Sequence, residues 1–307
     1  MQMRNAAVFK LSRRSTVLGS LALLGSLSHT TRAGTITDAG NVSVSVTAPK
    51  RIVTIGSAIT EIVFALGEKS HVVAVDLTSM GVAGAQGMID VGYMRALSTE
   101  GVLSQAPDLI CVSSDSGPPA VLDALRASGV PFALIPHVPT IEGIKVKVSL
   151  LGTLLDKAAE AEKLNAGIDA AFAKLAEKIA TVKQRPKVLF VLSLADNRIM
   201  AGGHTTAADT MITLAGGENI ATSFAGYKPI SAETILETPP DAIVMMNTGP
   251  NSHEAGEVFA NTAFAGSPAA KAGALFKMDG SYLLGFGPHT AEAATELAHK
   301  LHPELAL

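Results

Sequence analysis

The pattern of apolar and polar residues predicts a chain in which short buried strands alternate with helices. Residues 51–55 (RIVTI) form an apolar run of strand length. Residues 57–66 (SAITEIVFAL) place apolar side chains on one helical face, with Ser57 as N-cap and Gly67 as the stop. Residues 71–75 predict the next strand. This order is typical of a parallel sheet covered by helices, so we expect an α/β fold.

One later stretch differs from this alternation. Residues 157–183 are rich in Ala, Lys and Glu, and their apolar side chains recur every three or four residues. This predicts a long amphipathic helix of roughly 40 Å. We therefore expect two doubly wound, Rossmann-like lobes joined by a single long α-helix, with an N-terminal lobe at 34–155, the bridging helix at 156–184 and a C-terminal lobe at 185–307. A stiff helix between the lobes predicts only a small opening motion.

A segment of the first lobe recurs in the second. Residues 92–110 read GYMRALSTEGVLSQAPDLI, and residues 226–243 read GYKPISAETILETPPDAI. Both begin with Gly-Tyr, continue to a Glu, and reach Pro-Asp before an apolar run. Such a recurrence indicates that one structural unit is used twice. It predicts two Gly-Tyr turns that face each other across a cleft. Residues 202–217, just before the second copy, predict an apolar helix closed by glycine.

The first 33 residues have the pattern of an export signal. Basic residues, among them Arg13 and Arg14, precede an apolar run at 17–27 and a small-residue site ending at Ala33. The apolar run is too short to span a bilayer. The adjacent arginines favour a twin-arginine signal over an ordinary one. No cysteine lies near the cleavage site, so we expect a soluble periplasmic protein without a lipid anchor.

Composition excludes several classes of protein. Hydrophobic residues make up 48% of the chain and charged residues 17%, which predicts a sizeable core rather than disorder. The formal charge is −3 and no basic block carries interleaved aromatics, so we expect no nucleic-acid partner. The single cysteine, Cys111, lies in an apolar run and is best explained as a small buried hydrophobe.

Enzyme signatures are absent from the sequence. It contains no GxSxG, HExxH, CxxC or P-loop motif. Its eight histidines are scattered along the chain. Nothing nominates an acid and a base, so we expect a binding protein rather than an enzyme.

The two Gly-Tyr turns are better candidates for a site. A free phenol has a pKa of about 10, but a trivalent iron and a nearby cation can hold it as phenolate, and tyrosine is an axial ligand for haem iron. Arg95 lies two residues after Tyr93, and Lys228 follows Tyr227. Either cation could stabilise a phenolate or pair with an anionic ligand group. On spacing alone, packing of both tyrosines at turns with hydrogen-bonded hydroxyls is the simpler explanation.

Two glutamates form a second repeated feature. Glu100 and Glu233 occupy equivalent positions at the start of a short predicted helix, where the helix dipole favours a carboxylate. Capping explains the residue type but not the symmetric pair. On equivalent surfaces of two lobes, they would present two anions to a partner that carries two arginines.

Four segments resemble a known family. They are 91–110, 201–220, 226–243 and 283–290. They are similar to the substrate-binding proteins of ABC importers for iron siderophores, cobalamin and haem, and most of all to the haem-binding periplasmic proteins. The resemblance covers essentially the whole chain after the signal.

This resemblance implies haem as the transported ligand, bound in the cleft. It implies Tyr93 as the axial iron ligand, so that any metal is bound through haem. It also implies that Glu100 and Glu233 dock onto arginines of an inner-membrane ABC permease, which works with its ATPase. An outer-membrane haem receptor system is the further partner we consider.

The chain departs from this family at two places. Relatives commonly carry an arginine in the loop that is 247–257 here, where Arg95, Lys228 or His253 would have to replace it. Relatives also often have Arg where His289 stands. Further candidate cleft residues are Ser57, Tyr227, His204, His253 and His289.

Three alternatives stay open at this point. The same scaffold could carry a ferric siderophore or a corrinoid, which are bulkier and need more polar or cationic walls. A haem- or metal-dependent enzyme is the alternative from another class, although the sequence supplies no acid/base pair for it. A module that binds only a protein partner is the third.

Overall fold

Buried strands form the centre of the first lobe. In the computed structural model, which describes residues 33–195, 198–247 and 253–305, five parallel strands form one sheet in the order β5-β4-β3-β6-β7. These strands are β5 (Ile89–Asp90), β4 (Val72–Val75), β3 (Ile52–Ile55), β6 (Leu109–Ser113) and β7 (Phe132–Ile135). All residues of β3 and β6 are buried, as expected for strands covered on both faces. The predicted export signal lies outside the described residues, except for Ala33.

Helices cover both faces of this sheet. On one face lie α1 (Ser57–Ala65) and α4 (Ile141–Leu154), and on the other lie α2 (Thr99–Leu103) and α3 (Pro119–Ala127). Gly56 (φ 106°), rather than Ser57, is the N-cap of α1, and the N-cap makes no side-chain hydrogen bond. Ser57 is therefore the first helical residue. The short helices η1 (Lys69–His71) and η2 (Leu77–Gly81) flank β4.

A small hairpin lies at the N-terminal end of the described chain. Strands β1 (Gly34–Thr37) and β2 (Ser43–Val46) pair antiparallel and alternate buried with exposed residues. Gly34 approaches the end of α4 so closely that a Cβ atom there would lie 2.2 Å from the Leu154 carbonyl oxygen.

The second lobe has a mixed sheet. Three parallel strands form its core, β8 (Lys187–Ala195), β12 (Ala242–Asn247) and β13 (Leu275–Asp279). Strands β9 (Arg198–Gly202) and β11 (Tyr227–Ile230) continue it antiparallel at one edge. The short β10 (Glu218–Asn219) pairs parallel with β8. Its covering helices are α6 (Ala207–Leu214), α7 (Ala232–Glu237), α8 (Ala255–Ala260), α9 (Pro268–Ala272) and α10 (Gly280–Leu284).

Helix α6 is shorter than the 202–217 helix that the sequence predicts. Gly202 still belongs to β9, and the helix begins only after Thr206, whose side-chain oxygen accepts a hydrogen bond from the Asp209 amide. Between them, Gly203 packs so closely on Phe224 that a Cβ atom would lie 2.2 Å from the Phe224 carbonyl oxygen. The amides of Gly203 and His204 donate to the Gly226 and Phe224 carbonyl oxygens, so this segment pairs with the 224–226 loop instead of extending the helix.

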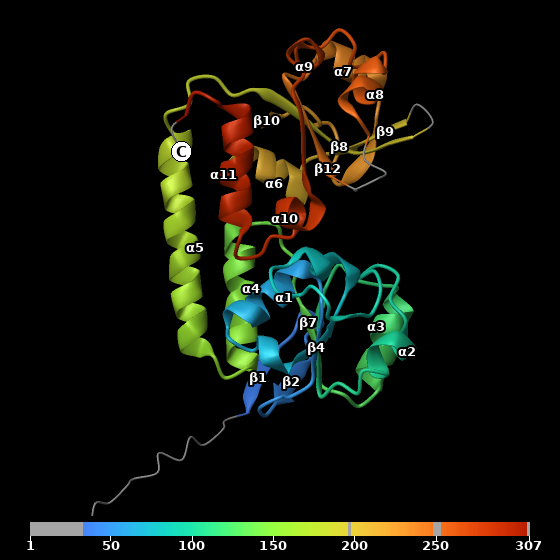
Figure 1. The fold of residues 1–307 in the computed structure, drawn as a ribbon, viewed down its shortest axis with the longest axis vertical. Coiled ribbons are helices and arrows are strands. Elements are labelled where there is room, and N and C mark those ends of the chain that lie inside the picture. The colour runs from blue at the N-terminus through green and yellow to red at the C-terminus, as the bar shows by residue number, and fades with distance from the viewer. Residues whose placement is uncertain (1–32, 196–197, 248–252, 306–307) are drawn as a thin grey trace, which may run out of the picture. The chain divides into compact units, whose positions relative to one another are not determined.

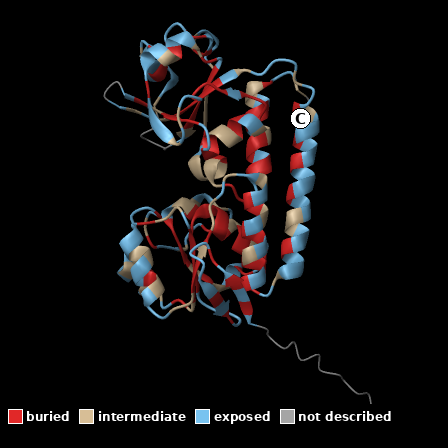
Figure 2. Ribbon diagram, turned by 180° about the vertical axis from the view of Figure 1, so that it is seen from behind, coloured by how far each residue is buried: buried red, intermediate tan, exposed pale blue. Residues whose placement is uncertain are grey.

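One long helix runs alongside both lobes. Helix α5 (Ala158–Ile179) has 22 residues and packs against α4 of the first lobe and α11 (Thr290–Leu301) of the second. Its inner face is buried and its outer face is exposed, as Figure 2 shows. At 1.5 Å per residue its length is about 33 Å, shorter than predicted because α5 ends at Ile179. We propose that the N-terminal lobe spans 34–155, the bridging segment 156–184 and the C-terminal lobe 185–307.

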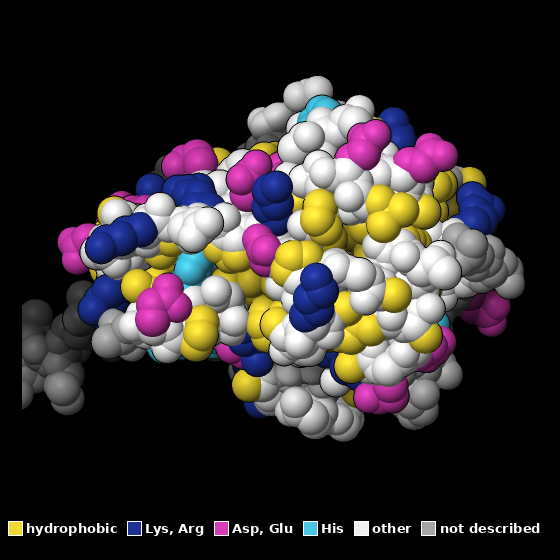
Figure 3. Space-filling model, turned by 90° about the horizontal axis from the view of Figure 1, so that it is seen from above, with side chains coloured by type: hydrophobic (Ala, Val, Ile, Leu, Met, Phe, Trp, Pro, Cys, Tyr) yellow, Lys and Arg dark blue, Asp and Glu magenta, His cyan; other side chains and the backbone are white. Residues whose placement is uncertain are grey.

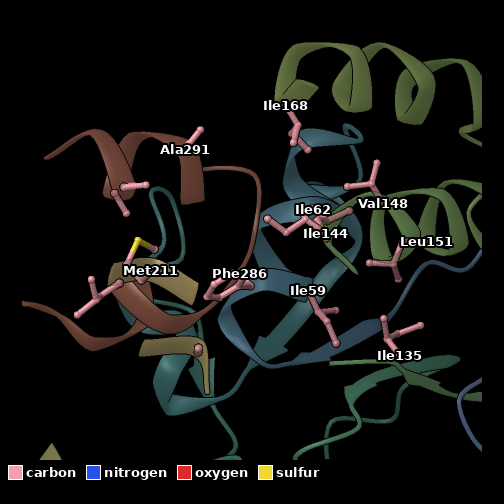
Figure 4. Close-up of a cluster of buried hydrophobic side chains, with 14 of the residues drawn as sticks. Ile59, Ile62, Ile135, Ile144, Val148, Leu151, Ile168, Met211, Phe286 and Ala291 are labelled. Atoms are coloured by element: carbon pink, nitrogen blue, oxygen red, sulfur yellow. The ribbon is translucent and has the colours of Figure 1, made fainter. Parts of the chain in front are cut away.

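The two lobes share a continuous hydrophobic core on the side of α5. It includes Ile59 and Ile62 of α1, Ile168 of α5, Met211 of α6 and Phe286 (Figure 4). A polar contact also joins the two lobes within this core. Lys147 of α4 is 1% exposed, and its Nζ donates a hydrogen bond to the Phe286 carbonyl oxygen at 2.6 Å. Burial lowers the pKa of Lys147 to about 8, although Asp115 and Glu61 oppose the shift.

The repeated segments fold alike around their central strands. Asp108 accepts hydrogen bonds from the Lys50 and Arg51 amides beside β3, and Asp241 accepts one from the Lys187 amide at the start of β8. Each Pro-Asp pair therefore fixes the beginning of its lobe's central strand. The repeat in the sequence corresponds to a repeat in the structure.

Candidate functional site

Tyr93 lies on an exposed turn after β5. Gly92 adopts φ 97°, a conformation that favours glycine, and its carbonyl accepts a hydrogen bond from the Leu77 amide at 3.0 Å. The turn leaves Tyr93 41% exposed. Nη1 of Arg95 donates to the phenol oxygen at 3.0 Å, and the guanidinium lies 5.9 Å from the centre of the ring. The sequence-predicted pair is thus brought into direct contact.

Two further residues complete this cluster, and sequence reasoning missed both. Asp115 follows β6 and accepts a hydrogen bond from Nη2 of Arg95 at 2.6 Å. His137 follows β7, with its Nδ1 3.9 Å from the Asp115 carboxylate. Their position directly after two buried strands was the available signal, because the carboxyl ends of parallel strands meet at one edge of a sheet.

The cluster is electrostatically coupled. Burial acts to raise the pKa of Asp115, but His137, the Ser113 hydroxyl and Arg95 together hold it below its usual value. Burial lowers the pKa of His137, against the attraction of Asp115, and Lys147 and Arg95 lower it further. At neutral pH the cluster therefore contains the Arg95–Asp115 ion pair beside an uncharged His137.

Tyr227 occupies a different environment. It opens β11, pairs with Gly202 of β9, and packs its ring edge-on against Phe190 at 6.2 Å. Burial raises the pKa of Tyr227, and hydrogen bonds from the Ala208 amide and the Thr206 side chain act against this rise. Its hydroxyl is thus engaged by the N-terminus of α6 within its own lobe.

The two turns are near enough to interact across the lobes. The charge of Arg95, in the first lobe, acts on the phenol of Tyr227 in the second. Lys228 is exposed beside Tyr227 in β11. His204 is exposed as well, and its backbone pairs with Phe224 and Gly226 next to that turn.

Exposed apolar side chains flank the Tyr93 turn. Leu77, the first residue of η2, is 52% exposed, and Val138, which follows His137, is 47% exposed. Both follow strands at the same carboxyl edge of the first sheet as Tyr93 and Asp115. A ligand that covers Tyr93 can therefore also cover apolar surface.

Three other sequence-predicted cleft residues lie elsewhere. Ser57 and His289 line a cavity of about 830 Å³ between α1, α5, α10 and α11, to which neither Gly-Tyr turn contributes. His289 pairs with Glu61 of α1, which raises the pKa of His289 to about 8. His253 pairs through Nδ1 with Glu257 at 2.6 Å.

The two predicted docking glutamates occupy equivalent positions. Glu100 lies in the first turn of α2 and Glu233 in the first turn of α7, and both are exposed. The helices begin in the same way, since Ser98 accepts a hydrogen bond from the Gly101 amide and Ser231 accepts one from the Thr234 amide.

The described residues contain neither a preformed metal site nor a membrane-spanning helix. Among the described residues, no group of three or more His, Cys, Asp or Glu side chains could hold a metal ion. None of their helices is long and apolar enough to cross a membrane. In the space-filling view from the end carrying α7 and α9, acidic and basic side chains are interspersed over that face (Figure 3).

Comparison with known proteins identifies the family. The model for periplasmic binding proteins matches residues 52–282. The solved structure of the periplasmic heme-binding protein RhuT from Roseiflexus sp. RS-1 is 31% identical, with a TM-score of 0.79, over 83% of this chain and 98% of that one.

The names of two further relatives do not refer to haem. The ABC transporter substrate-binding lipoprotein YvrC of Bacillus subtilis is 25% identical over 88% of this chain and 86% of its own length. The vitamin B12-binding protein of Yersinia pestis is 26% identical over 66% of this chain and 71% of its own length. The chain thus belongs to the periplasmic binding protein family and is a substrate-binding protein of an ABC importer, not an enzyme.

Proposed function

We propose that this protein binds ferric haem in the periplasm and delivers it to an inner-membrane ABC permease. The observation that carries the proposal is the exposed phenol of Tyr93, whose oxygen accepts a hydrogen bond from Arg95 at 3.0 Å. A guanidinium beside a phenol favours the phenolate that a trivalent iron binds. The similarity to a heme-binding protein of known structure supports the same ligand.

The surroundings of Tyr93 favour a flat, largely apolar ligand. Leu77 and Val138 expose apolar surface at the same edge of the sheet, which suits a porphyrin face. In this proposal Lys228, on the opposite turn, meets the propionates. Arg95 is already paired with Asp115, so its role is to support the tyrosine.

A corrinoid is the second candidate ligand, because curated relatives bind vitamin B12. Absorption titrations of the purified protein with hemin and with cyanocobalamin separate the two. We expect a shift of the Soret band with hemin, and its loss in Tyr93→Phe. Binding of cyanocobalamin with no spectral response to hemin would overturn the haem assignment.

The family supports a proposal for delivery and location. Substrate-binding proteins of ABC transporters pass their ligand to a permease with its ATPase, and we propose that Glu100 and Glu233 form the contact. We propose a periplasmic location reached through the N-terminal signal. One relative is a lipoprotein, so fractionation of the expressed protein tests whether it is soluble or membrane-attached.

A further inference from the structure

Three consecutive hydrogen bonds connect the central sheet of the first lobe to Tyr93. The Ser113 hydroxyl, at the end of β6, donates to Oδ1 of Asp115 at 2.5 Å. Oδ2 of Asp115 accepts from Nη2 of Arg95 at 2.6 Å. Nη1 of the same guanidinium donates to the Tyr93 phenol oxygen at 3.0 Å. Each carboxylate oxygen and each terminal guanidinium nitrogen in this chain of contacts has its own partner.

The backbone holds the two ends of this chain of contacts together. The Gly117 amide donates to the Met94 carbonyl oxygen at 2.9 Å, and the Leu97 amide donates to the Gly117 carbonyl oxygen at 3.1 Å. The loop that carries Asp115 is thus tied to the loop that carries Tyr93 and Arg95. Ser113 is 6% exposed, so the carboxylate is anchored on a buried strand end.

Arg95 needs such an anchor. Its side chain is 53% exposed, and a free arginine on a loop samples many rotamers. The planar guanidinium can serve two partners at once when a carboxylate fixes its plane. With Nη2 held by Asp115, Nη1 is directed at the phenol oxygen.

We infer that Asp115 is a positioning residue, which orients Arg95 against Tyr93 and so fixes the direction of the phenol oxygen toward a bound iron. The inference rests on the proposed function for its role in haem binding. Its structural part, the ordering of Arg95 by Asp115, is independent of any ligand. The inference also places the carboxylates of a bound ligand near Lys228 rather than near Asp115, because the Asp115 carboxylate would repel a second anion.

The first experiment uses the ligand-free protein. The ¹H–¹⁵N spectrum of the arginine side chains follows the Arg95 guanidinium, with Asp115→Asn compared against Asp123→Asn, the same change at an exposed position of α3. We expect slowly exchanging Arg95 side-chain protons in the wild type and in Asp123→Asn, and fast exchange in Asp115→Asn. Unchanged exchange in Asp115→Asn would overturn the inference.

The second experiment measures hemin binding and the tyrosinate-to-iron charge-transfer band. We expect Asp115→Asn and Arg95→Ala each to weaken hemin binding by about 10- to 100-fold, the range for residues that orient a metal ligand. Both substitutions are expected to shift the band, and the double variant to be no weaker than Arg95→Ala. Multiplicative losses would mean that Asp115 contacts haem directly, which contradicts a positioning role.

A milder variant covers the case in which Asp115→Asn does not fold. Ser113→Ala removes only the second anchor of the carboxylate, and we expect a smaller loss with the same shift of the band. If Tyr93→Phe leaves hemin binding intact, the proposed function fails, and the ligand-free spectrum still decides whether Asp115 orders Arg95.

Discussion

The two Gly-Tyr turns share a sequence pattern but not an environment. Both are followed by a serine-capped helix with an exposed glutamate and by an aspartate that fixes the central strand. Tyr93, however, stands on a turn with its phenol oxygen bonded to Arg95. Tyr227 opens an edge strand and has its hydroxyl engaged by the start of α6. A repeated unit thus supplies two phenols, and the neighbouring residues leave only Tyr93 beside a paired cation.

The largest expected effect tests that difference directly. Tyr93→Phe removes the proposed iron ligand itself, and we expect hemin affinity to fall by about 100-fold or more, beyond the range for residues that only orient a metal ligand. Tyr227→Phe removes an equivalent hydroxyl that is already engaged within its lobe, so we expect a change below about 3-fold. Equal losses in the two variants, measured by absorption titration, would show that both phenols reach the iron.

The second prediction concerns the exposed glutamate that follows each turn. Glu100→Ala with Glu233→Ala removes both proposed docking anions while leaving the Tyr93 cluster untouched. We expect hemin binding to be unchanged and ATP-driven uptake through a reconstituted permease to fall about 10-fold or more, with smaller losses in the single variants. Glu237→Ala, on the same helix as Glu233, is the matched control. Normal uptake by the double variant would contradict symmetric docking.

A third test addresses the buried polar contact between the two lobes, that of Lys147 with the Phe286 carbonyl oxygen. The pKa of buried Lys147 is about 8 in the folded protein, against 10.5 for a free lysine. Between these values the unfolded chain binds more protons, so the free energy of unfolding should rise with pH from about 8 to 10.5 through this group. Below pH 8 the folded protein carries the unfavourable buried charge in full.

Replacement of this side chain makes the test specific. We expect Lys147→Met to lack that rise in urea denaturation curves and to be comparable to the wild type at pH 7, since an apolar side chain of similar size replaces a buried charge. Lys145→Met, on the same helix, is the control. The same rise in wild type and Lys147→Met would assign it to another group.

A smaller effect tests whether the two copies fold alike. Ser98→Ala and Ser231→Ala each remove an N-cap hydrogen bond, to the Gly101 and Thr234 amides respectively. Each substitution should lower the free energy of unfolding by about 1 kcal/mol. If thermal denaturation gives losses for Ser98→Ala and Ser231→Ala that differ by more than about 1 kcal/mol, the two caps do not contribute equally to stability.

The smallest effect is at another polar contact between the lobes, that of His289 with Glu61. Pairing with Glu61 raises the pKa of His289 to about 8 from 6.5. The stabilisation is therefore complete below pH 6.5 and lost as the pH rises to about 8. More than half of the His289 side chain is exposed, so screening should limit the effect to less than about 1 kcal/mol.

The same denaturation measurements check this contact. We expect His289→Gln to lose the decline in stability between pH 6.5 and 8, and His299→Gln, an exposed position on α11, to retain it. A decline that persists in His289→Gln would assign it to a different residue.

Much of the fold could be predicted from local patterns. The predicted strands at 51–55 and 71–75 correspond to β3 and β4, and the predicted helix at 57–66 corresponds to α1. The antiparallel edge formed by β9 and β11 was not predicted, because Tyr227–Ile230 carries no apolar run and is defined by its pairing with β9. The shortened α6 likewise reflects tertiary pairing, since the amides of Gly203 and His204 bond to carbonyl oxygens of the 224–226 loop.

The sequence by itself determined the two-lobe α/β architecture and the repeated Gly-Tyr turns, since periodicity and repetition are written in the order of residues. It also placed Arg95 near Tyr93, because they are two residues apart. Only the tertiary structure brought Asp115 and His137 to that pair, from loops 20 or more residues away, and directed the Tyr227 hydroxyl into its own lobe. The reason is physical: hydrogen bonds between loops depend on how parallel strands align their ends, and no local pattern encodes that alignment.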